Sequence, residues 1–147
     1  MAEGFEFSFE GMEELARDLE KAVNIAPLQA KKTLKRLAKE FKASAAERAE
    51  VELNHADRTG EEQKKSIGEK WGSKIVDDRL GMAALVWNSA PHFHLIENGH
   101  NLVRGGNVIG FVQGKHIMEK TRNDYKDIVP ERFEKMADKI LKESGLN

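Results

Sequence analysis

The chain has 147 residues and a formal net charge of −1. This length suits a single domain, and the charge balance gives no reason to expect nucleic acid or an acidic membrane as the main partner. The absence of cysteine excludes a disulfide framework, a thiolate metal site and a cysteine nucleophile. The chain has no run of about 18 apolar residues, and its acidic start is unlike a signal peptide, so we expect a soluble protein made in a reducing cytoplasm without a membrane partner.

Charge is distributed unevenly along the first third of the sequence. Residues 1–26 carry seven acids against two bases, whereas between residues 27 and 53 seven bases stand against four acids. This polarity suits head-to-tail contact between copies, although two solvated helix faces explain it more simply.

The N-terminal half is predicted to hold one strand and two helices. Phe5, Phe7 and Phe9 alternate with polar residues, as in a strand with one buried face. Helical spacing of apolar residues predicts a helix over residues 12–23 and, opened by Pro27, a second over residues 27–53, roughly 40 Å long at about 1.5 Å per residue. The alanine-rich end of the second helix suggests either close approach by another copy or a frayed, solvated terminus.

The middle of the chain is predicted to contain two strands. Residues 54–60 have turn composition, and residues 61–66 are charged enough for an exposed loop or a short helix. Residues 71–76 and 82–87 have strand composition, and the second is apolar enough for the middle of a sheet. Their tryptophans, Trp71 and Trp87, are predicted to fill the core.

The last third predicts a hairpin arm and a C-terminal helix. Gly105 and Gly106 separate two short apolar runs, which indicates a tight hairpin within an arm at about residues 101–113. A helix from about His116, kinked or interrupted at Pro130, is expected to stop at Gly145. The fold class is therefore α+β: a small antiparallel or mixed sheet of about four strands, flanked by a long second helix and a C-terminal helix, in one domain over residues 1–147.

A histidine-rich segment offers the strongest candidate for chemistry. Histidine and carboxylate side chains are good ligands for zinc and similar metals, and five of them gather here: His92, His94, Glu97, His100 and His116. Two readings stay open. In one these residues form the site of a metal-dependent hydrolase or nuclease, and in the other they are a strand end and a helical turn whose histidines make local hydrogen bonds or line an assembly surface. The helical HExxH arrangement is absent, and the neighbouring Phe93, Leu95 and Ile96 suggest packing.

Other catalytic patterns are missing. Ser66 and Ser89 lack the context of a nucleophile elbow, and no glycine-rich phosphate loop occurs. The aromatic residues are not interleaved with basic ones, so we expect no sequence-specific contact with nucleic acid. No catalytic residue and no cofactor are predicted.

The order of the segments resembles that of the tail-completion or head–tail joining proteins of tailed bacteriophages, a family of minor tail components. Its phrases are matched by FEGMEELARDLEKA at residues 9–22, AKKTLKRLAKEFK at residues 30–42, Thr59-Gly60 before Ser66-Ile67, Ala90-Pro91-His92-Phe93 before Glu97-Asn98-Gly99-His100, and Gly114-Lys115-His116. The resemblance covers nearly the whole chain. One departure is Glu61-Glu62, where the family pattern would place a buried leucine after the Thr-Gly turn.

The resemblance implies a structural virion protein and not an enzyme. Such a protein forms a homo-oligomeric ring, expected to be a hexamer, at the head-proximal end of a phage tail or of a phage-derived tail-like particle. Its partners would be further copies of itself and the tail terminator, tail tube and neck or connector proteins. A metal-dependent hydrolase is the alternative, and a toxin–antitoxin or regulatory adaptor is a third possibility that only the charge polarity favours.

Overall fold

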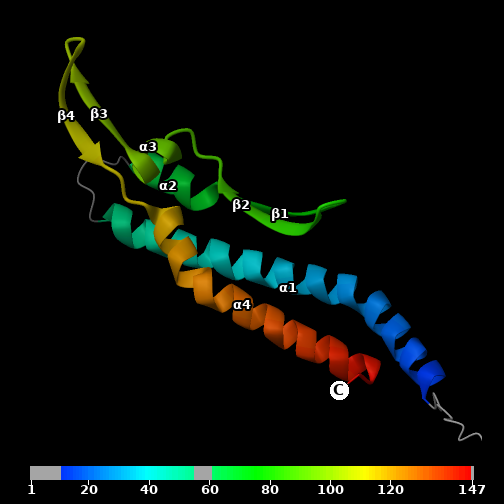
Figure 1. The fold of residues 1–147 in the computed structure, drawn as a ribbon. Coiled ribbons are helices and arrows are strands. Elements are labelled where there is room, and N and C mark those ends of the chain that lie inside the picture. Colours follow the sequence, from blue (N-terminus) through cyan, green and yellow to red (C-terminus); the bar gives the residue numbers. More distant parts are fainter. Residues whose placement is uncertain (1–10, 55–60, 147) are drawn as a thin grey trace, which may run out of the picture.

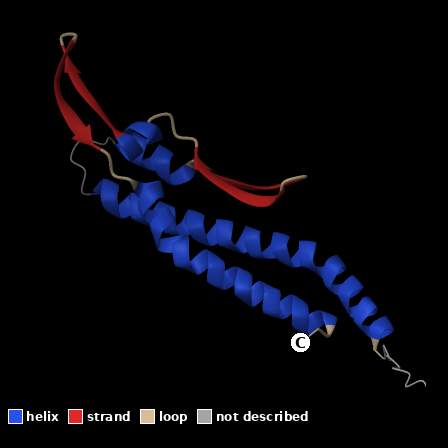
Figure 2. Ribbon diagram, viewed as in Figure 1, coloured by secondary structure: helices blue, strands red, loops and turns tan. Residues whose placement is uncertain are grey.

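The computed structural model of the protein describes residues 11–54 and 61–146 (Figure 1). Its elements in chain order are α1 (Met12–Asn54), α2 (Glu61–Glu69), β1 (Trp71–Asp78), β2 (Gly81–Asn88), α3 (Phe93–Asn98), β3 (Gly99–Arg104), β4 (Asn107–Gln113) and α4 (Ile117–Ser144). The predicted α+β class is confirmed, with a long helix, four antiparallel strands and a C-terminal helix. Figure 2 shows the two long helices side by side; one hairpin, β1–β2, runs along α1, and the other, β3–β4, extends past the C-terminal end of α1. The predicted strand at residues 5–9 and the Thr59-Gly60 turn lie outside the described residues.

The first helix is longer than the sequence predicts. The prediction of two helices divided before Pro27 is wrong, because α1 runs unbroken for 43 residues with Pro27 inside it. Proline lacks the N–H that would bond to the Val23 carbonyl, and its ring crowds the preceding turn, so a bend is expected there. Figure 1 shows α1 changing direction in its N-terminal third. Packing along α4 on both sides of Pro27 holds the two parts in one helix.

Helix α4 packs antiparallel to α1 over most of its length. The contact buries Leu37 and Ala38 and brings the Phe41 and Tyr125 rings edge to face at 5.3 Å between centroids. Polar pairs follow both edges of the contact: Gln29–Glu143, Glu40–Arg132, Ser44–Tyr125, Arg48–Asp124 and Glu52–Lys120. Helix α4 itself continues through Pro130, and it ends at Gly145 as predicted.

The core lies at the C-terminal end of α1. Its buried members come from α1, α2, the segment around α3 and the start of α4: Ala49, Leu53, Ile67, Ala90, Phe93 and Ile117. Ala45 and Ala49 are completely or almost completely buried within this chain. Both interpretations of the alanine-rich end of the helix, as a contact with another copy and as a frayed terminus, are therefore wrong. Small side chains there let the rest of the chain approach α1 closely.

Strands β1 and β2 form a two-stranded antiparallel hairpin that turns at Arg79 and Leu80. The strands are confirmed, but β2 is not in the middle of a sheet, because β1 is its one partner among the described residues. Trp71 packs against the core and meets the Phe93 ring edge to face. The prediction that Trp87 fills the core is wrong: its side chain is 42% exposed, and its ring lies over Gly72, where a Cβ would come within 2.6 Å of it.

Strands β3 and β4 form the second hairpin and confirm the predicted arm. Gly105 and Gly106 form its turn with φ angles of 58° and 80°. Residues other than glycine rarely adopt these positive φ angles. The register shifts between Leu102 and Val103, as at a β-bulge. In the described part of the chain no helix has the length and apolar character to cross a membrane.

We expect Pro27→Ala to raise the free energy of unfolding by about 1–3 kcal/mol, because alanine restores a hydrogen bond inside a continuous helix. Urea unfolding followed by circular dichroism measures this change. Leu28→Ala is the matched control, since Leu28 is the next residue and is mostly exposed; it should change stability by less than about 0.5 kcal/mol. If two helices met at this point instead, losing a helix-starting proline would leave stability unchanged or lower it.

The Glu52–Lys120 ion pair makes stability depend on pH. The hydrogen bond from Lys120, 3.0 Å from Glu52, lowers the pKa of Glu52 below its ordinary value of 4.5. The carboxylate therefore stabilises the fold above that value, and this contribution is lost as the pH falls through the lower pKa of the folded state. Both side chains are partly exposed, so the contribution is at most about 1 kcal/mol.

We expect Glu52→Gln to be less stable than the wild type at about pH 7 and to approach wild-type stability below about pH 4. Urea unfolding at a series of pH values tests this convergence. Glu47→Gln, at an exposed position of the same helix, serves as the control. A stability difference for Glu52→Gln that persisted unchanged into acid would contradict the ion-pair explanation.

Candidate functional site

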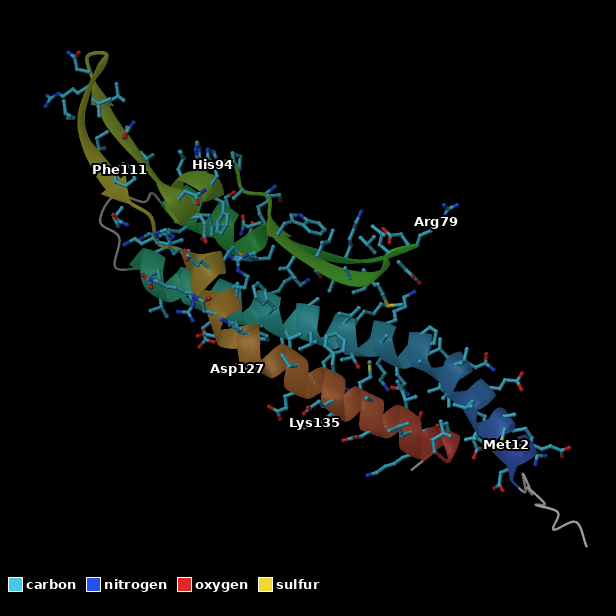
Figure 3. The ribbon with its side chains drawn as sticks, viewed as in Figure 1. Met12, Arg79, His94, Phe111, Asp127 and Lys135 are labelled. Atoms are coloured by element: carbon cyan, nitrogen blue, oxygen red, sulfur yellow. The ribbon has the colours of Figure 1, made fainter. Side chains whose placement is uncertain are left out.

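The histidine-rich segment does not assemble into a metal site. His92 precedes α3, His94 is exposed on α3, His100 lies in β3 and His116 precedes α4. Figure 3 shows His94 on the outer side of α3, away from the helical body. Within residues 11–54 and 61–146, no three or more histidine, cysteine, aspartate or glutamate side chains are grouped so that they could hold a metal ion.

Glu97 has a structural role at the start of α4. Its carboxylate accepts hydrogen bonds from the backbone N–H of Met118 at 3.0 Å and of Glu119 at 3.1 Å. These are amides of the first turn of α4, which have no partner inside the helix, and a negative charge there also interacts favourably with the helix dipole. Glu97 therefore caps α4 although it lies about twenty residues earlier in the sequence. The hydrogen bonds of the cap occupy the same carboxylate that the metal-site hypothesis assigned as a ligand.

The Gly-x-His phrase serves the same junction. The backbone N–H groups of Lys115 and His116 donate to the carbonyls of Ile96 and Glu97 at 2.7 and 3.2 Å. A Cβ at Gly114 would lie 2.6 Å from the carbonyl carbon of Asn98, so glycine is needed for this close approach. His116, with φ of 51°, turns the chain into α4, and its Nδ1 lies 2.9 Å from a Glu119 carboxylate oxygen.

The uncovered apolar surface of the β3–β4 arm is the first candidate surface for assembly. We call residues 101–113 the arm. Four of its apolar side chains are 58–63% exposed: Val103, Val108, Ile109 and Phe111. The two strands pair with each other, and Figures 1 and 3 show the arm extending away from the helices, with Phe111 near its base. A two-stranded hairpin with such a surface is marginally stable by itself, and contiguous exposed apolar side chains mark an interaction site.

The N-terminal part of α1 carries the second candidate surface. Four apolar residues at helical spacing, which we call the α1 stripe, are 43–70% exposed: Met12, Leu15, Leu19 and Val23. The stripe lies beside the face that α1 turns toward α4. Because α4 ends at Gly145, next to Asp18, Met12 and Leu15 lie beyond its end, whereas Leu19 and Val23 lie level with it on a side that it leaves exposed. The sequence predicts the apolar spacing of this stripe, but not that the described residues would leave it uncovered.

The third surface is a cationic groove between α1 and α4 with a volume of about 580 Å³. Its lining includes five basic side chains: Lys32, Arg36, Arg132, Lys135 and Lys139. Arg132 pairs with Glu40 at 2.9 Å, and Lys135 pairs with Glu131 at 2.7 Å, an interaction that lowers the pKa of Glu131. The acidic and basic segments that the sequence shows thus belong to one helix: the acidic residues lie at the N-terminal end of α1, and the basic residues lie in its middle.

Comparison of the chain with protein-family models, with curated proteins and with solved structures gave no match.

We expect Glu97→Ala to lower the free energy of unfolding by about 1–2 kcal/mol, because two first-turn amides of α4 lose their acceptor. The matched control is Glu134→Ala, which removes an exposed carboxylate from the middle of α4. Urea unfolding of the two variants measures the difference. Equal stabilities would contradict the capping role of Glu97.

Proposed function

We propose that the protein is a structural component of a phage tail or of a phage-derived tail-like particle, where it forms a ring at the head-proximal end and joins the tail to the neck. The uncovered apolar surface of the arm is the observation that carries this proposal. Removing apolar surface from water stabilises a complex by about 25 cal/mol for each Å² buried. A partner that covered the exposed side chains of the arm would therefore bind with a favourable free energy. The sequence motifs that resemble the tail-completion family are the reason for proposing a phage tail as the place of assembly.

The shape of the subunit suits assembly into a ring. A closed ring needs two different, complementary surfaces on every copy. This chain has an apolar arm near one end of α1 and an apolar stripe at the other end (Figure 3). We propose six copies as the ring number that the family resemblance implies. The remaining exposed faces would then contact the tail terminator, the tail tube and the neck or connector proteins.

The described residues give the hydrolase alternative little support. The Glu97 carboxylate is bonded to the start of α4, and His116 lies beside Glu119. A metal ion would have to displace the cap that Glu97 provides, at a cost in the stability of α4. We therefore propose a role in assembly without a catalytic centre.

The direct test is electron microscopy of particles that carry an epitope-tagged copy of the protein. We expect labelled density as a ring between the tail tube and the neck, and we expect particles made without the protein to contain unjoined heads and tails. The double variant Ile109→Ser with Phe111→Ser should stay folded but fail to enter particles, whereas Leu80→Ser, at the exposed turn of the other hairpin, should enter normally. The proposal fails if the protein is missing from every particle, and zinc or manganese bound at one ion per chain would then favour the hydrolase.

A further inference from the structure

We propose that the arm of one copy docks on the α1 stripe of a second copy. This inference rests on the proposed function, because it specifies the contact between neighbouring subunits of the ring. Both surfaces are apolar, both are exposed in the single chain, and each consists of four large side chains. Contact between them would remove both surfaces from water in a single interface.

The dimensions of the two surfaces match. Met12 and Val23 are eleven residues apart on a helix, which places them about 17 Å apart along its axis. Strand β4 has seven residues, which corresponds to about 23 Å. The hairpin can therefore lie along the whole stripe, with its β-branched and aromatic side chains over the leucines and methionine of the helix.

The charges around the two surfaces are also complementary. Arg104 is the one charged residue of the arm. The helix segment that carries the stripe, residues 12–23, has four acids against two bases: Glu13, Glu14 and Glu20 are exposed, Asp18 pairs with Lys21, and Arg17 is an exposed base. An arginine at the tip of an apolar arm is attracted to such an acidic border, and like charges there would oppose docking.

The arm cannot reach the stripe of its own chain. The arm begins at α3, and Phe93 of α3 packs in the core with Ala49 near the C-terminal end of α1. From Ala49 back to Val23 is 26 residues of helix, or about 39 Å, and Figure 1 shows the arm extending in the opposite direction. The contact must therefore join two copies. Made head to tail, it repeats into a ring or an open chain, as the proposed function requires, whereas two copies that exchanged arms reciprocally would close as a dimer.

Cysteine cross-linking tests the contact directly, because the natural sequence has no cysteine. One preparation carries Val108→Cys on the arm, and the other carries Leu19→Cys on the stripe. Mixed at high concentration under mild oxidation, they should form the mixed disulfide at least about tenfold faster than the Val108→Cys preparation mixed with Leu28→Cys. Leu28 is also exposed on α1 but lies outside the stripe, so it matches the chance collision rate.

Two results would overturn the inference. One is a cross-linking rate for Leu19→Cys no higher than that for Leu28→Cys. The other is a Leu19→Cys thiol that stays unreactive toward a small maleimide in the single chain, which would show that another part of the same chain, such as its N-terminal residues, already covers the stripe.

A mixing experiment distinguishes docking of the arm on the stripe from contacts between two arms or between two stripes. A copy with Ile109→Ser and Phe111→Ser keeps its stripe, and a copy with Leu15→Ser and Leu19→Ser keeps its arm. Sedimentation should find each variant monomeric alone and the mixture as a one-to-one dimer that grows no further, and two variants that fail to pair would count against docking. The result does not depend on the particle, so the protein could be found at the tail without this contact, or make this contact and be missing from tails.

Discussion

The antiparallel contact between α1 and α4 is the interaction on which the rest of the structure depends. It aligns 43 residues of one helix with 28 of the other, so part of α1 must remain without a partner. The core holds the start of α4 at the C-terminal end of α1. The unmatched length therefore falls at the N-terminal end and leaves Met12 and Leu15 beyond α4, whereas Leu19 and Val23 are exposed because they lie beside the face that α1 turns toward α4.

Sequence patterns with a local cause predicted the fold well. The strands predicted after residue 70, the Gly105-Gly106 turn and the stop at Gly145 depend on composition and backbone geometry within a few residues, and all of these are present. The division before Pro27 failed because the packing of α4 on both sides outweighs a local penalty of about 3 kcal/mol. The prediction that Trp87 fills the core was wrong for a different reason. The alternation of side chains along a strand places Trp87 on one face of the hairpin, but its own segment does not indicate which face the rest of the chain covers.

The candidate site shows the same limit. The residues around Glu97 were singled out by their types, but the structure distributes the histidines between the segment before α3, α3 itself, β3 and the start of α4, and no three metal-ligating side chains of the described residues group together. A carboxylate is attracted both to a metal ion and to the exposed amides of a helix start. Composition cannot distinguish these two sources of positive potential, and the structure shows the Glu97 carboxylate bonded to the backbone amides of Met118 and Glu119.

Pro27 separates the stretch of α1 that carries the α1 stripe from the longer stretch that packs along α4 up to the core. The bend at this residue therefore sets the direction in which the chain presents its stripe. In a head-to-tail assembly that direction enters the rotation relating neighbours, and the rotation decides whether a chain of subunits closes on itself or continues as a helix. A residue that weakens one helix would then determine the curvature, and through it the number of copies, of the whole assembly.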